Sequence, residues 1–98
     1  DLVEGVKLII ENENSKKQTF NLTFGKSNSV KKLSEILSNH FKDIKLEFDS
    51  EDPFTPKRGT LDITKARLTL GYNPKNPIEL AYPKYINWYK EVWSKFNN

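Results

Sequence analysis

The sequence predicts an α/β or α+β fold in which a small parallel sheet is flanked by helices. Apolar and polar residues alternate over residues 19–24 and again over residues 44–48, which is the period of half-buried strands. Between these segments, residues 29–41 carry apolar side chains at helical spacing. A strand, a helix and a strand in this order are expected to form a right-handed crossover with parallel strands.

The first element of the chain is predicted to be an amphipathic helix over residues 1–12. Its apolar side chains recur at helical spacing, and they are Leu2, Val3, Val6, Ile9 and Ile10. The helix signal starts at residue 1, which suggests that a preceding segment is missing. Residues 11–18 contain no apolar side chain, and a solvated loop is expected there.

The helix after the first strand is the most strongly indicated element. Ser27 or Ser29 can cap it, and its inward stripe consists of Val30, Leu33, Leu37 and either His40 or Phe41. His40 falls in its last turn, where a surface histidine is expected and no chemistry is assigned.

Residues 56–75 hold a complete set of helix boundary signals. Asp62 can accept hydrogen bonds from the first turn, Ile63, Ala66 and Leu70 share one face, and Gly71 ends the helix.

The last helix is predicted to begin near Pro83 and to run to about Lys95, after a short turn over residues 77–81. A proline inside a helix removes a backbone hydrogen bond at a cost of about 3 kcal/mol, so the helix is not expected to start earlier. Its inner face is aromatic and is read as core packing: Tyr82, Tyr85, Ile86, Tyr89, Trp93 and Phe96.

Composition restricts the class of protein. The 98 residues suit a single domain, no cysteine is present, and a cytoplasmic location is expected because a reducing compartment is compatible with that composition. The net charge of +3 is too small and too dispersed for a nucleic-acid partner. No apolar run is long enough to span a bilayer, so no membrane partner is expected.

Five segments carry a further signal: residues 1–5 read DLVEG, 19–25 TFNLTFG, 29–37 SVKKLSEIL, 61–75 LDITKARLTLGYNPK and 86–89 INWY. In the same order along the chain, they resemble segments of the extended short-chain dehydrogenase/reductase family, which includes the NAD-dependent nucleotide-sugar epimerases and dehydratases. Residues 61–66 and 70–75, LDITKA and LGYNPK, are similar to its "D-[IA]-S-K-A…LG[WY]-x-P" segment. Residues 1–5 resemble its "D-[LV]-[VA]-x-[GA]" helix start, and residues 19–25 its "x-[FY]-N-[IL]-x-x-G" strand. Residues 29–37 and 86–89 resemble its "S-[VL]-x-[ED]-L-[AS]-E-x-[IL]" and "I-x-W-[YH]" segments.

The resemblance implies that residues 1–98 are a single partial domain, the C-terminal substrate-binding portion of such an enzyme, similar to UDP- or dTDP-sugar 4-epimerases. The cofactor domain, and with it NAD, would belong to the parent protein. The four glycines form no dinucleotide-binding loop, and no tyrosine is followed four residues later by the lysine of the family's catalytic pair. We therefore assign no catalytic, cofactor-binding or metal-binding residue, and this chain should catalyse nothing by itself.

The reaction of the parent stays open between epimerisation, dehydration and decarboxylation, as does the sugar nucleotide. The alternative is a non-catalytic binding or scaffold module that shares the fold.

Lys57 and Arg58 are the candidate substrate-binding residues. The family commonly places an arginine ten residues ahead of the capping aspartate, where it meets the diphosphate of a nucleotide diphosphate-sugar, but this chain has Asp52 there. Arg58 offers a planar fork suited to bidentate phosphate binding, and Lys57 precedes it. The acidic residues 49–53 are read as a solvated loop rather than as a metal site.

A homodimer is also expected. In the family, the region of the first helix lies between the cofactor domain and the substrate portion, so part of its apolar partner surface would be absent here. A second copy could cover the apolar stripes of the first and last helices.

Overall fold

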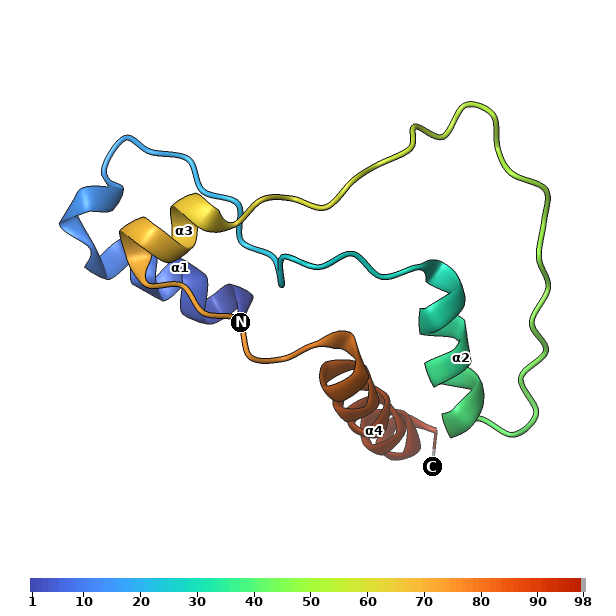
Figure 1. Cartoon of the computed structure of the whole chain (residues 1–98). Helices are drawn as coiled ribbons and strands as arrows, with labels where there is room; N and C mark the ends of the chain where they lie inside the picture. Colours follow the sequence, from blue (N-terminus) through green and yellow to red (C-terminus); the bar gives the residue numbers. More distant parts are fainter. Residues whose placement is uncertain (98) are drawn as a thin grey trace. The chain divides into compact units, whose positions relative to one another are not determined.

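The computed structural model describes residues 1–97, and every regular element in this part of the chain is helical (Figure 1). The elements are α1 (Leu2–Glu11), the 3-10 turn η1 (Glu13–Ser15), α2 (Val30–His40), α3 (Thr64–Leu70) and α4 (Ile78–Phe96). No β-strand occurs within the described residues. The predicted α/β or α+β fold with a parallel sheet is therefore wrong.

The two segments predicted as strands are extended but have no strand beside them. A strand needs a neighbour to take up its backbone N–H and C=O groups. In residues 19–24, the alternating Phe20 and Leu22 instead pack against a cluster formed by helical residues and their flanks. In residues 44–48, the apolar side chains are exposed. Alternation thus marks an extended chain here, without the pairing that makes a sheet.

The described residues fall into two compact units. Unit 1 consists of Asp1–Ser27 and Gly59–Pro77, and unit 2 consists of Asn28–Arg58 and the chain from Ile78 onward. Unit 1 contains α1, η1 and α3, whereas unit 2 contains α2 and α4. The single partial domain over residues 1–98 stays a prediction.

The core of unit 1 is built on α3. Ile63, Ala66, Leu70 and Tyr72 are buried, which confirms the predicted inward face of this helix. Leu8 and Ile9 from α1, and Phe20 and Leu22 from the following segment, pack against this cluster. Three stretches far apart in the sequence therefore share one small core.

The predicted Gly71 stop of α3 is confirmed, whereas the N-cap is Ile63 and not the predicted Asp62, which lies one residue further ahead. The Asp62 carboxylate accepts a hydrogen bond from the Thr64 N–H at 2.8 Å. At the other end, Gly71 has a left-handed backbone with φ of 68°, and its N–H donates to the Arg67 carbonyl at 3.1 Å. Glycine adopts this conformation without the steric cost that a β-carbon brings.

Helix α1 confirms the predicted first helix and is tied to the end of unit 1 by Asp1. The Asp1 carboxylate accepts hydrogen bonds from the backbone N–H groups of Lys75 at 3.0 Å and Asn76 at 2.8 Å, and from the Asn76 side-chain amide at 2.9 Å. Ile9 reaches the core, whereas Leu2, Val3, Val6 and Ile10 stay exposed.

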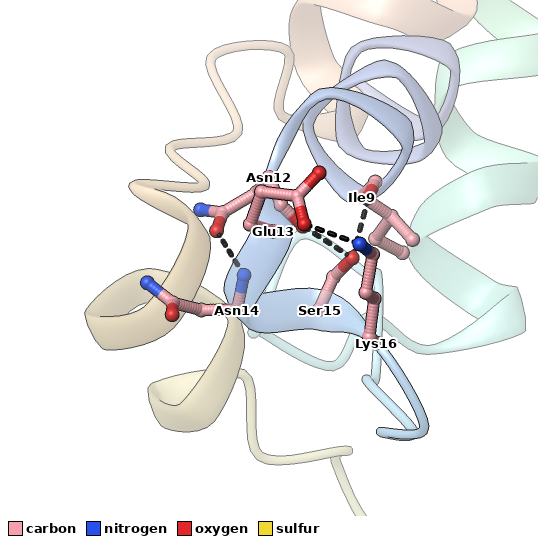
Figure 2. Close-up of polar contacts among 6 residues, drawn as sticks. All are labelled: Ile9, Asn12, Glu13, Asn14, Ser15 and Lys16. Carbon is pink, nitrogen blue, oxygen red and sulfur yellow. Dashed lines mark hydrogen bonds and ion pairs between the residues drawn. The ribbon is translucent and has the colours of Figure 1, made fainter.

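The predicted loop after α1 contains the η1 turn, which Figure 2 shows in detail. The Ser15 hydroxyl lies 2.6 Å from the Ile9 carbonyl and 2.7 Å from that of Asn12, and Asn12 Oδ1 accepts from the Asn14 N–H at 2.9 Å. Glu13 and Lys16 form an ion pair. The Asn12 amide also donates to the Thr69 carbonyl at 3.0 Å, which joins this turn to α3.

In unit 2, α2 packs against α4. Ser29 caps α2, since its hydroxyl accepts from the Lys32 N–H at 3.1 Å. Lys90 of α4 holds the other end: its Nζ donates to the His40 carbonyl at 2.6 Å and lies 4.4 Å from the centroid of the Phe41 ring. An ion pair joins Lys32 to Glu79.

Helix α4 corrects the prediction of a turn followed by a helix from Pro83. It is continuous from Ile78 to Phe96, with Pro83 inside it. Pro83 lies early in the helix, where it removes only the hydrogen bond to the Glu79 carbonyl. The earlier start places Tyr82 within the helix, where it lines a groove with Leu37 and Phe41.

The hydrogen bond of the Tyr72 hydroxyl should contribute to the stability of unit 1. This hydroxyl donates to the Thr23 carbonyl at 3.1 Å from a side chain that is buried in the core. We expect Tyr72→Phe to lower the free energy of unfolding by about 0.5 to 1.5 kcal/mol, because the carbonyl loses its partner. Urea unfolding followed by circular dichroism measures the change.

Tyr85→Phe is the matched control. Tyr85 is exposed, and its hydroxyl makes no hydrogen bond within residues 1–97, so the same deletion there should change stability by less than about 0.5 kcal/mol. Equal effects of the two substitutions would contradict the assigned hydrogen bond.

Candidate functional site

Lys57 and Arg58 lie on the exposed, irregular segment that connects α2 to α3. Neither side chain makes a hydrogen bond or an ion pair with any residue that the structure describes. Both cations are therefore fully available to an anion. The structure does not bring any further candidate residue to them, so the pair forms no built pocket.

Asp52, the residue at the position where the resembled family has an arginine, is occupied in a local turn. Its carboxylate accepts from the Phe54 N–H at 2.9 Å and from the Thr55 hydroxyl at 2.8 Å. These hydrogen bonds, the Phe54 one foremost, lower the pKa of Asp52 below its ordinary value. Asp52 thus stays negatively charged and would repel a phosphate close to it.

The other titratable candidates have structural surroundings. His40 is the last residue of α2, and its Nδ1 lies 2.8 Å from the carbonyl oxygen of Ile36, one helical turn earlier. Burial raises the pKa of Tyr72, so its hydroxyl is protonated at neutral pH and serves as a donor to Thr23. Neither arrangement pairs a nucleophile with a base.

The glycines do not fit a dinucleotide. A β-carbon on Gly5 would lie 2.9 Å from Leu22 Cδ1, and one on Gly25 would lie 2.8 Å from Ile63 Cδ1, so both glycines serve close packing in unit 1. Gly71 ends a helix, and Gly59 stands in open space five residues ahead of the first residue of α3. A pyrophosphate would find no glycine-rich turn that leads into a helix N-terminus.

No group of three or more His, Cys, Asp or Glu side chains in residues 1–97 is arranged to hold a metal ion. No helix among these residues has both the length and the apolar character that crossing a membrane requires.

A surface feature that the sequence did not indicate is a groove between α2 and α4. A hollow of about 180 Å³ is lined by aromatic and aliphatic side chains, namely Leu37, Phe41, Tyr82, Tyr85, Ile86 and Tyr89. The aromatic residues of α4 were predicted to form a core, yet Ile86 is the one buried side chain of unit 2 among those described. The helical period places these residues on one face but cannot tell how much of that face is covered.

Comparisons with protein-family models, with curated proteins and with solved structures gave no match to this chain.

Asp62, which lies just ahead of α3, should make the stability of unit 1 depend on pH. Hydrogen bonds from the Thr64 hydroxyl and, secondarily, the Thr64 N–H lower the pKa of Asp62. A lowered pKa means that the stabilising contribution is present above the ordinary value of about 3.9 and is lost as the pH falls through the lower folded-state value. We expect the urea concentration at the unfolding midpoint of unit 1 to decrease as the pH is lowered from 5 to 3.

Asp62→Asn separates this effect from that of the other carboxylates. Asparagine also caps helices but does not titrate, so the variant should lose less stability over the same pH interval. The same pH dependence in both proteins would show that Asp62 contributes nothing through its charge.

Proposed function

We propose that this chain is the substrate-binding portion of an NAD-dependent nucleotide-sugar epimerase or dehydratase, similar to UDP- or dTDP-sugar 4-epimerases, and that it is inactive by itself. NAD and the catalytic residues would reside in a preceding cofactor domain of the parent protein. The proposal rests on the resemblance of five segments and does not include a parallel sheet, which residues 1–97 lack. A cytoplasmic location is part of the same proposal.

One observation supports the proposal: the segments that carry the resemblance contact one another. Asp1 of the first segment binds Lys75 and Asn76 at the end of the "LGYNPK" segment. Tyr72 of that segment donates to Thr23 of the "FNLTFG" segment, and the Asn21 amide donates to the Asp62 carbonyl at 3.0 Å. Similarity confined to short runs would not require such contacts between them.

The two remaining segments support it in the same way within unit 2. Residues 29–37 belong to α2 and its cap, and residues 86–89 belong to α4. These two helices pack against each other, and Leu37, Ile86 and Tyr89 line the same groove. All five segments thus have structural partners among the others.

In this proposal, Arg58 binds the diphosphate of the nucleotide sugar and Lys57 adds positive charge. Both are exposed and unpaired within the described residues, as an unoccupied anion contact would be. Arg58 is the stronger candidate because its guanidinium can donate two parallel hydrogen bonds to one phosphate group.

The chain of 98 residues should not bind NAD. It lacks the glycine turn and helix N-terminus whose backbone N–H groups would replace the water around the pyrophosphate. Calorimetric titration is the measurement, and a dissociation constant at or below about 10 μM would contradict this expectation.

The reading frame upstream of Asp1 distinguishes the proposal from its alternative, a non-catalytic binding or scaffold module. The proposal requires a glycine-rich βαβ start and a Tyr-x-x-x-Lys pair there. A reading frame without them would overturn it and leave the binding module.

In the parent protein, Arg58→Ala should raise the KM for the nucleotide sugar by about 10- to 150-fold. This is the kinetic equivalent of a charge-assisted hydrogen bond of about 1.5 to 3 kcal/mol. Folding should be unaffected, because Arg58 has no partner in the described chain. Arg67→Ala, an exposed arginine on α3, is the control that should leave the KM unchanged. The same KM in both variants would show that Arg58 is a solvated side chain with no contact to the nucleotide sugar.

A further inference from the structure

Helix α4 carries a continuous row of aromatic side chains, which we call the aromatic face: Tyr82, Tyr85, Tyr89, Trp93 and Phe96. At 100° per residue, these five positions fall within an arc of about 80°. Several of the rings lie nearly parallel, with Tyr82 and Tyr85 inclined by 9° and Tyr89 and Trp93 by 15°. Rings stacked along one side of a helix make a smooth surface suited to close contact.

Much of this face is uncovered although α2 packs beside it. Tyr89 is 42% exposed, Tyr85 54%, Trp93 58% and Phe96 82%, and the adjacent Trp88 is 55% exposed. Since an aromatic side chain can bury about 150 to 250 Å², the four exposed members of the aromatic face leave on the order of 450 Å² of ring surface open. A stable protein interface buries about 800 Å² on each partner, so this face alone provides about half of what one partner contributes to a dimer interface.

The aromatic face contains no charged residue. The nearest cation on α4, Lys90, is already engaged with the His40 carbonyl and the Phe41 ring. Two such faces can therefore meet without burying an unpaired charge. Burying one would be costly because the charge would lose its hydration. The face also carries no cation that could neutralise a phosphate, which nucleic-acid binding depends on.

We propose that the aromatic face of α4 binds the same face of a second copy of this chain, with the two helices antiparallel about a two-fold axis. Tyr89 is midway between Tyr82 and Phe96, so covering the whole row places each Tyr89 opposite its counterpart. The same register places Tyr85 opposite Trp93 of the second copy. A two-fold contact is closed and stops at the dimer.

Because the chain has no cysteine, a single introduced cysteine tests this geometry directly. Tyr89→Cys lies at the proposed axis and should form an interchain disulfide under mild oxidation. Asn87→Cys is the matched control: it is exposed on the same helix but about 160° away from Tyr89 around the axis, and it should remain monomeric on a non-reducing gel. Crosslinking of both variants to the same extent, or of the control alone, would overturn the proposal.

Sedimentation equilibrium of the unmodified chain at about 50 μM provides a test that does not depend on any variant folding. A dimer is expected, and Trp93→Glu should weaken it at least tenfold while helical content by circular dichroism is retained. A folded monomer at this concentration would refute the dimer. Binding of the chain to phosphatidylcholine vesicles, without self-association in solution, would instead assign the aromatic face to a membrane surface and refute the proposal equally.

Discussion

Unit 1 depends on one close approach between three segments at Gly5. A β-carbon on this residue would lie 2.9 Å from Leu22 Cδ1 and 3.1 Å from Cε2 of Tyr72, distances that side chains do not adopt without displacement of a neighbour. The missing side chain lets α1 lie directly on Leu22 and on the Tyr72 ring. The Tyr72 hydroxyl then reaches the Thr23 carbonyl, and the Asp1 carboxylate reaches the backbone of Lys75 and Asn76. Close packing and hydrogen bonds thus both hold α1 against the segments that contain Leu22 and Tyr72.

Unit 2 is held together differently. It has a single buried side chain, Ile86, among the residues described, and polar contacts at the two ends of its helix pair. Lys32 and Glu79 join one end, and Lys90 binds the last carbonyl of α2 at the other. Surface ion pairs contribute little to stability, since solvent screens them. A helix pair with so little buried surface gains from any cover over its aromatic residues, which is the physical basis for assigning that surface to an interface.

The candidate phosphate contact differs from both units in having no structural role. Residues that stabilise a fold are already paired, as Asp52 is with Phe54 and Thr55. Lys57 and Arg58 are exposed and make no polar contact with residues 1–97. A phosphate bound by two exposed cations on an irregular segment would also have to order their side chains, which has an entropic cost.

The sequence by itself determined the local structure wherever a signal acts through neighbouring residues. The Ser29 cap, the Gly71 stop and the inward face of α3 follow from hydrogen bonds and spacings within a few residues. The sequence did not indicate the groove between α2 and α4. Tertiary structure alone decided whether residues 19–24 and 44–48 paired, because a strand requires a partner that alternation cannot supply. Tertiary structure also decided that α4 continues through Pro83 and that its aromatic face stays partly exposed. Packing against another helix, and not the helical period, sets where a helix begins and which side chains it buries.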